Sequence, residues 1–470
     1  MKQILTVLAL GFTITCYSQK IVLKKGIIID SLVVNDSITE SYSLYLPTDF
    51  EIDRPWPVAF VFDMQGRGSR SLRMFKDAAE EHGYILAAPN NLSDTLSISD
   101  NVLATQRMFN TVVTILPIHQ NQIYAAGFGS GGKYATLVPT FLKSITGVVA
   151  CGTSLANTEI LTSKNPYRFI NIVGNADYNY MDVQQVESTL NRMRFPNQIL
   201  AFEGGHEWPP SELLSDALGI LTMNAMAKGF IDKDDEFVNQ NYRKNLASVS
   251  TYVSANRPLL AESKLSEMME IYSPFRTIDS VKDSRKVLRK TSRFKVANRS
   301  QTNNFLKEQF LREDYAYYME EDLLTYNYNN LGWWKYQTEE IQKFKKNPDV
   351  LINQMGFRLE GYVNALLADN IDMVKDAKTK DVEGLNFLYM MKTILQPEDH
   401  DAYLQVISLS SELDDYGAAL FYLEELLKRG YVDKARLYNL DNTALLRITP
   451  EFNELVERYL KNARYEIIQE

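Results

Sequence analysis

The most constraining feature of the sequence is an alternation of short apolar runs and helix-forming segments between residues 20 and 228. Runs such as PVAFVFD (57–63) and RFINIVG (168–174) are apolar over most of their length, which is typical of strands buried on both faces of a sheet. Strands that alternate with helices favour a parallel arrangement. We therefore predict an α/β fold for this part of the chain, with a mostly parallel sheet flanked by helices.

The alternation also predicts the order of the elements. An opening pair of strands is expected over 21–34 and 40–47, and the remaining strands are separated by helices. The expected strands are 57–63, 83–89, 121–127, 146–152, 168–174 and 198–204, and the expected helices are 70–82, 101–116, one directly after the glycines at 127–132, 182–193 and 211–227.

The pattern changes after residue 229, where strand signals fade and helical periodicity dominates. Within this all-α part, residues 414–431 resemble the second half of a tetratricopeptide repeat, and Gly430 is placed to end their helix. One weak repeat does not establish an array, because stacking needs about three repeats. We predict a signal peptide, an α/β domain, a helical region and a tetratricopeptide-like helical end, over 1–18, 19–228, 229–394 and 395–470. The apolar stripe of the repeat-like helix consists of Tyr416, Ala419, Leu420, Leu423, Leu426 and Leu427.

Two segments of the helical part stand out by composition. Residues 281–299 carry eight Lys or Arg residues and one acid. Such a run indicates either a solvated helix face or a docking surface for an acidic partner or lipid headgroups. Residues 315–334 are rich in Tyr and Trp, which favours packing between helices over a sugar-binding platform.

The first residues are typical of a secretory signal. Lys2 supplies the charge, residues 4–14 form the apolar core, and Cys16 and Ser18 are small residues at the −3 and −1 positions of a cut after Ser18. A lipoprotein cut before Cys16 fits less well, because two threonines precede it. We expect a periplasmic or secreted protein in which Cys151 is the one remaining thiol, so that no disulfide forms within the chain.

The composition argues against several classes of function. The net charge of −9 argues against a general nucleic-acid binder. The chain has four histidines and two cysteines, so a Cys/His metal site is not expected, and no cofactor is predicted. No run after the signal is long and apolar enough for a transmembrane helix.

The stretch IYAAGFGSGGKYA (123–135) fits three glycine motifs. As a dinucleotide fingerprint it lacks the acidic residue that should follow about 20 residues later, since 133–158 contains no Asp or Glu. As a P-loop it has Tyr134 where a Ser or Thr should bind Mg²⁺. The third possibility is a nucleophile elbow, G-x-S-x-G, whose serine is displaced.

Two later loops support the elbow. Asp177 follows a predicted buried strand, and His206 follows the last predicted strand. In α/β-hydrolases the catalytic residues occur in the order nucleophile, acid, histidine. The acid orients the imidazole, and the imidazole takes the proton of the nucleophile.

With these motifs, residues 20–228 resemble an α/β-hydrolase of the polyhydroxybutyrate depolymerase and feruloyl esterase type. The resemblance covers less than half of the chain. It implies an elbow of the form Y-x-x-G-x-S-x-G-G, an acid in a G-x-x-D loop and a histidine in H-x-W-P. The matching residues here are Tyr124, Gly127, Gly131 and Gly132, then Gly174 and Asp177, then His206, Trp208 and Pro209.

The sequence departs from this pattern at the nucleophile. Counting along the motif, the serine position falls on Gly129, and Ser130 comes one residue late. If Gly129 is the elbow residue, no hydroxyl points at His206, and Ser130 contributes its backbone N–H to the oxyanion hole. If the register has shifted, Ser130 is the nucleophile, although Phe128 is then large for a position that must be small.

The loop after the first buried strand, DMQGRGSR (63–70), stands where related hydrolases usually have His-Gly. Asp63 there would repel a developing oxyanion, whereas the glycines allow backbone donors to face a ligand. We expect Gln65, Gly66, Ser130 and Trp208 to contribute to binding.

Three functions remain open. The first is an exported pseudo-hydrolase of the cell envelope that binds a small ester or a glycan-like ligand, or a partner. The second is a secreted carboxylic ester hydrolase that uses Ser130, His206 and Asp177. The third is a scaffold in which the C-terminal helical part binds a protein.

Overall fold

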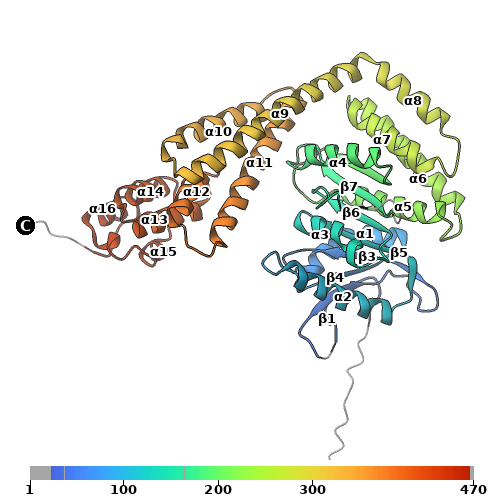
Figure 1. Cartoon of the computed structure of the whole chain (residues 1–470), viewed down its shortest axis with the longest axis horizontal. Coiled ribbons are helices and arrows are strands. Elements are labelled where there is room, and N and C mark those ends of the chain that lie inside the picture. The colour runs from blue at the N-terminus through green and yellow to red at the C-terminus, as the bar shows by residue number, and fades with distance from the viewer. Residues whose placement is uncertain (1–22, 36, 160, 162–165, 466–470) are drawn as a thin grey trace, which may run out of the picture.

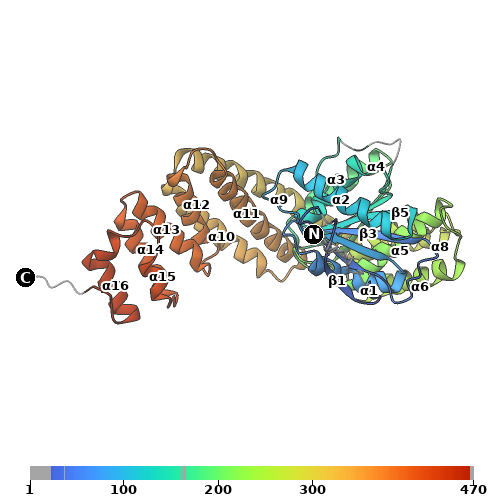
Figure 2. The same cartoon turned by 90° about the horizontal axis from the view of Figure 1, so that it is seen from below.

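The structure is a computed structural model that describes residues 23–35, 37–159, 161 and 166–465. The predicted signal peptide lies outside these residues. Figure 1 shows a sheet-containing part at one end and a row of helices that extends away from it to the C-terminal end. The view from below shows the same elongated arrangement (Figure 2).

The sheet has eight strands in the order β1-β2-β4-β3-β5-β6-β7-β8. β2 is antiparallel to both β1 and β4, and every pairing from β3 to β8 is parallel. The predicted mostly parallel sheet is therefore confirmed. The strands are β1 (Ile28–Val33), β2 (Ser41–Tyr45), β3 (Trp56–Phe62), β4 (Ile85–Pro89), β5 (Ile118–Phe128), β6 (Gly147–Cys151), β7 (Arg168–Gly174) and β8 (Asn197–Phe202).

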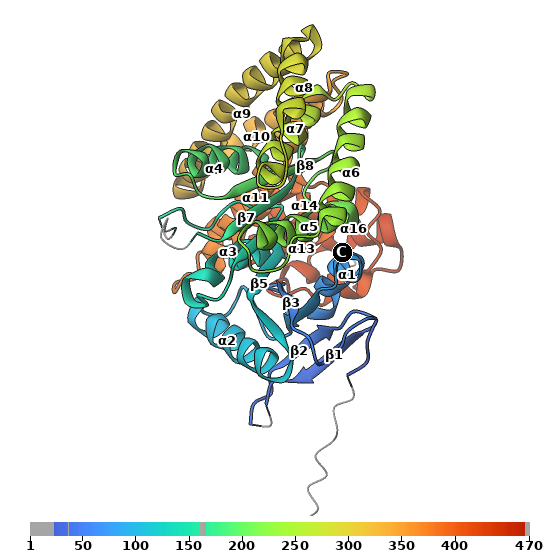
Figure 3. The same ribbon diagram turned by 90° about the vertical axis from the view of Figure 1, so that its right-hand side faces the viewer.

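Helices cover both faces of the sheet (Figure 3). One face packs against α1 and α5, and the opposite face against α2, α3 and α4. The interior strands β6 and β7 are buried along their whole length, as their apolar sequences predict. The helices are α1 (Gly68–His82), α2 (Ile98–Ile115), α3 (Ser130–Phe141), α4 (Tyr180–Arg192) and α5 (Ser211–Ala227).

Three further helices extend the core on the α1 and α5 face. They are α6 (Asp235–Ser254), α7 (Pro258–Tyr272) and α8 (Asp279–Lys290). Tyr242, Met268 and Val281 from these helices are buried in the same cluster as the sheet residues. The hydrophobic core of the sheet thus draws on residues beyond 228, and the domain boundary at that residue stays a prediction.

The long helix α9 (Ser292–Thr325) leads from the sheet-containing part into the remaining helices (Figure 1). This confirms the expected all-α part. None of the helices in the described ranges is both long and apolar enough to cross a membrane. The remaining helices are the 3-10 turns η1 (Tyr328–Asn330) and η2 (Leu446–Ile448), with α10 (Leu331–Lys345), α11 (Val350–Lys375), α12 (Val382–Leu395), α13 (His400–Glu412), α14 (Tyr416–Lys428), α15 (Lys434–Tyr438) and α16 (Pro450–Leu460).

The segments singled out from the sequence lie in these helices. Tyr315 and Trp334 are buried between α9, α10 and α11, and the indole N–H of Trp334 donates to Asp322 (2.8 Å), as the packing interpretation requires. The repeat-like segment forms α14, which ends just before Gly430, where φ is +82°. Its tetratricopeptide-like character stays a prediction.

Candidate active site

The glycine stretch forms a tight turn between a strand and a helix. β5 ends at Phe128, α3 begins at Ser130, and Gly129 between them has φ +54° and ψ −124°. Side chains larger than hydrogen are strained at this conformation, so glycine is favoured there. The N–H of Gly129 donates to the carbonyl of Cys151 (2.9 Å), which fixes the turn against β6.

The neighbouring glycines allow α3 to pack directly on the sheet. A Cβ atom on Gly131 would overlap the carbonyl oxygen of Phe62, and one on Gly127 would lie 2.5 Å from the backbone of Gly131. Carbon atoms in proteins do not approach one another this closely, since contact begins at about 3.5 Å. The glycine pattern is therefore explained by packing as well as by the turn itself.

Asp177 and His206 meet at the carboxyl ends of β7 and β8. His206 Nδ1 lies 3.0 Å from Asp177 Oδ2. Asp177 is fully buried, and its second oxygen accepts the backbone N–H of Asn179 (2.8 Å). The His206 side chain is 31% exposed. A buried carboxylate on Nδ1 fixes the ring orientation and leaves Nε2 for a reacting group.

The free nitrogen of this pair faces the glycine turn. A Cβ atom built on Gly129 would lie 3.8 Å from His206 Nε2, and no other heavy atom of the described residues comes within 4 Å of it once the chain neighbours are set aside. A side-chain hydroxyl at this position would be within reach of the imidazole. The structure therefore brings Gly129, His206 and Asp177 together in the order that the motif implies.

Ser130 points in a different direction. Its hydroxyl donates to Asp94 Oδ2 (3.2 Å), on the loop between β4 and α2. Partial burial raises the pKa of Asp94, the hydrogen bond from Ser130 opposes that rise, and the nearby charge of Asp63 adds to it. In this arrangement the Ser130 hydroxyl is held by a carboxylate rather than by the imidazole.

The loop after β3 holds the other predicted binding residues. Asp63 accepts the backbone N–H of Gln65 (2.9 Å) and forms an ion pair with Arg67 (3.1 Å). The Asp63 charge is thus balanced within the loop, and the Gln65 N–H is already engaged there. Gly66 has φ +66° and Gln65 is exposed, so their roles in ligand binding stay predictions.

Aromatic side chains surround His206. The rings of Phe128 and Tyr178 lie 4.8 Å and 4.7 Å from the imidazole, measured between ring centroids. Trp208 stacks on Phe128 at 5.1 Å and 28°. The sequence predicts Trp208 as a binding residue but does not single out Phe128 or Tyr178 for binding, although each directly precedes or follows a predicted site residue. Burial raises the pKa of the Tyr178 phenol, and the charges of Asp177 and a second aspartate add to the rise.

The helical part of the chain contacts one of these aromatic side chains. A Cβ atom on Gly361 in α11 would lie 3.0 Å from the ring of Tyr178. Tyr178 therefore contacts α11 on one side and His206 on the other. In the described ranges, no group of three or more His, Cys, Asp or Glu side chains is placed to hold a metal ion.

The strand order and the two layers of helices define the class: this is a protein of the α/β-hydrolase fold, followed by a helical part. No protein-family model matches the chain, and no curated protein matches it either.

Several solved structures are similar to part of the chain. An S-formylglutathione hydrolase from Staphylococcus aureus is 13% identical, and the match covers 43% of this chain and 98% of that one, with a TM-score of 0.34. Est1E from Butyrivibrio proteoclasticus is 10% identical over 43% and 99% of the two chains, with a TM-score of 0.34. Esterase 2 from Thermogutta terrifontis is 14% identical over 43% and 95%, again with a TM-score of 0.34.

Proposed function

We propose that this protein is an exported pseudo-hydrolase, in which the nucleophile position is vacant and the former active site binds a ligand or a partner. One observation carries the proposal: the position that faces His206 Nε2 is Gly129, which has no side chain to activate. Export rests on the N-terminal sequence alone.

The remaining groups suit binding better than turnover. Without a nucleophile, an enzyme of this kind loses roughly 10⁴- to 10⁶-fold in rate. The imidazole can still donate or accept one hydrogen bond, and the aromatic side chains of Phe128, Tyr178 and Trp208 offer apolar surface beside it. This combination suits a small ligand with an apolar group next to a polar atom.

A second candidate is a carboxylic ester hydrolase that uses Ser130 as the nucleophile. Its support is the place of Ser130, which is exposed at the first position of α3, where the helix dipole favours a developing negative charge. This mechanism requires the hydroxyl to leave Asp94 and to turn toward His206, with Asp177 orienting the ring.

Labelling with a fluorophosphonate probe, followed by mass spectrometry of the modified peptide, separates the two candidates. We expect no labelling of the wild-type protein. The control is the Ser130→Ala variant, which should behave like the wild type. Labelling of the wild type that disappears in Ser130→Ala would refute the vacant-nucleophile proposal and support the ester hydrolase.

A further inference from the structure

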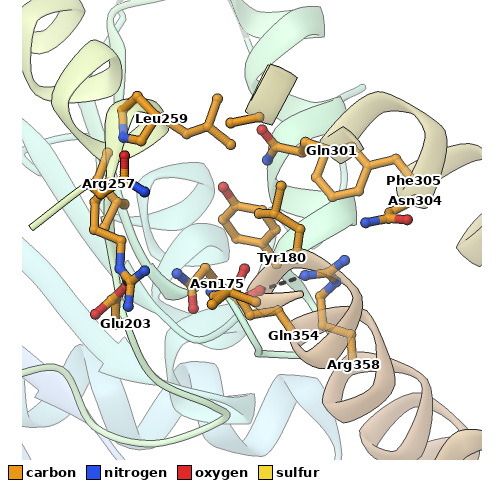
Figure 4. Close-up of a pocket in the computed structure, with 16 residues that line it drawn as sticks. Asn175, Tyr180, Glu203, Arg257, Leu259, Gln301, Asn304, Phe305, Gln354 and Arg358 are labelled. Carbon is orange, nitrogen blue, oxygen red and sulfur yellow. Dashed lines mark hydrogen bonds and ion pairs between the residues drawn. The ribbon is translucent and has the colours of Figure 1, made fainter. Parts of the chain in front are cut away.

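A cavity is lined in part by the loops that carry the acid–histidine pair, but neither Asp177 nor His206 lines it. Figure 4 shows the residues of its wall. Its volume is about 180 Å³, and it is enclosed by the loops after β7 and β8, the start of α7, and the helices α9 and α11. At roughly 15 Å³ for each water-sized atom, it has room for about a dozen non-hydrogen atoms. That is the size of one monosaccharide unit.

Carboxamide side chains dominate the polar part of its wall. Gln301 and Asn304 come from α9, Gln354 from α11, Asn175 from the loop after β7, and Asn256 from the turn before α7. A carboxamide both donates and accepts hydrogen bonds, as does a hydroxyl group, so several of them together can bind a molecule rich in hydroxyls.

One of these amides is incompletely satisfied. Asn304 Nδ2 is buried and has no hydrogen-bond partner in the described part of the chain. A buried donor without a partner is unfavourable, and an acceptor atom in the cavity would relieve that cost. An occupant with an acceptor atom would satisfy this donor.

The charged groups at the cavity are already paired with one another. The Arg358 guanidinium binds the Glu308 carboxylate with a shortest distance of 2.6 Å, and it also donates to the carbonyl of Asn175 (2.7 Å). Arg257 forms an ion pair with Glu203. Since each positive charge has a negative partner, the cavity offers no net charge to an ionic ligand.

The rest of the wall is apolar or aromatic. Tyr180 and Phe305 present rings and Leu259 presents an aliphatic side chain (Figure 4). Val350 and Leu351 also line the cavity. Rings beside hydrogen-bonding amides match a molecule with both C–H faces and hydroxyl edges. This combination fits a sugar ring better than it fits a purely aliphatic molecule.

We infer that this cavity binds a neutral, hydroxyl-rich molecule the size of one monosaccharide. The inference does not depend on whether Gly129 or Ser130 is the functional residue of the glycine turn. Asn175 and Glu203, which line the cavity, precede Asp177 and His206 by two and three residues. An occupant would therefore contact the two loops that carry the acid–histidine pair.

Saturation-transfer NMR on the full mature chain tests the inference, with glucose, galactose, mannose and N-acetylglucosamine as probes. We expect at least one of them to bind the wild type. In Asn304→Ala the affinity should fall about fivefold to tenfold, the usual effect of losing one hydrogen bond. Asn303→Ala is the matched control, because Asn303 is the preceding residue of α9, is exposed and does not line the cavity.

A second variant, Ala297→Phe, fills the cavity from α9 and should abolish binding while the far-ultraviolet circular dichroism stays native. Three results would overturn the inference: no signal from any of the four sugars, binding that survives Ala297→Phe in a folded protein, or tighter binding of glucuronate than of glucose. The last result would show that the cavity selects an anion. None of these outcomes depends on fluorophosphonate labelling, so a failure here is distinct from a failure of the proposed function.

Discussion

The Gly129→Ser substitution tests the interpretation of the glycine turn most directly. The new Cβ atom would lie 3.8 Å from His206 Nε2 and would meet nothing else within 4 Å apart from its chain neighbours. Because a hydroxyl lies one bond beyond Cβ, a staggered rotamer can bring the oxygen to roughly 2.6–3.2 Å from Nε2, which is hydrogen-bonding distance. We therefore expect a serine, histidine and aspartate triad to form without movement of the loops.

The expected magnitudes follow from two opposing effects. At φ +54° and ψ −124° a side chain costs about 1–3 kcal/mol, which lowers the thermal midpoint by a few degrees. In return, the imidazole gains a nucleophile to activate. Removal of such a nucleophile costs about 10⁴- to 10⁶-fold in other enzymes. If the wild-type turn is not used for turnover, as proposed, the serine variant should recover part of that factor, on the order of 10²- to 10³-fold over the wild type.

The assay is hydrolysis of a short-chain nitrophenyl ester, together with fluorophosphonate labelling at position 129. Gly129→Ala is the matched control, since it has the same backbone strain and no hydroxyl. Adding Asp177→Asn to the serine variant should remove most of this gain and return the turnover close to the wild-type level, because the imidazole then takes the wrong tautomer. If Gly129→Ser folds and is neither labelled nor active, the assignment of Gly129 as the nucleophile position is wrong.

Two further predictions concern buried and partly buried charges. Glu308→Ala leaves the buried guanidinium of Arg358 without its carboxylate and should destabilise the protein by about 3–5 kcal/mol. The double variant Glu308→Leu, Arg358→Met should lose less stability, because it leaves no unpaired charge; calorimetry that finds the same loss of stability for both variants would contradict this. Burial and the charges of Glu262 and Glu270 raise the pKa of Glu187. Its contribution to stability is therefore present below the pKa of the unfolded chain and is lost as pH rises through the raised value. Glu187→Gln should accordingly be more stable than the wild type at pH 8, by under about 1 kcal/mol, and the difference should vanish near pH 4.

The sequence predicted the sheet well because its signals are local. Continuous apolar runs placed the buried strands, and the segments between them placed the helices on both faces. The positions of the candidate site residues at the strand ends could be predicted from the same alternation of strands and helices. Once the strands are known to be parallel, the loops with Gly129, Asp177 and His206 must lie at one edge of the sheet.

The sequence did not predict how the helical part meets the sheet, because that contact depends on pairs far apart in the chain. Glu308 and Arg358 are 50 residues apart, and Arg358 reaches Asn175 across 183 residues. No periodicity within one helix indicates such a partner. For the same reason the cavity between α9, α11 and the sheet loops was not foreseen, nor was the contact of Tyr178 with α11.

The acid–histidine pair also has a structural role that does not require catalysis. The buried Asp177 carboxylate accepts one hydrogen bond from Asn179, and the Asn179 side chain donates to the carbonyl of Gly152 (2.9 Å). These bonds connect the loops after β6 and β7, and the contact with His206 adds the loop after β8. Replacing Asp177 would leave buried groups unpaired, whereas the fold does not require a hydroxyl at position 129. The acid–histidine pair therefore holds the three loops together whether or not the site hydrolyses esters.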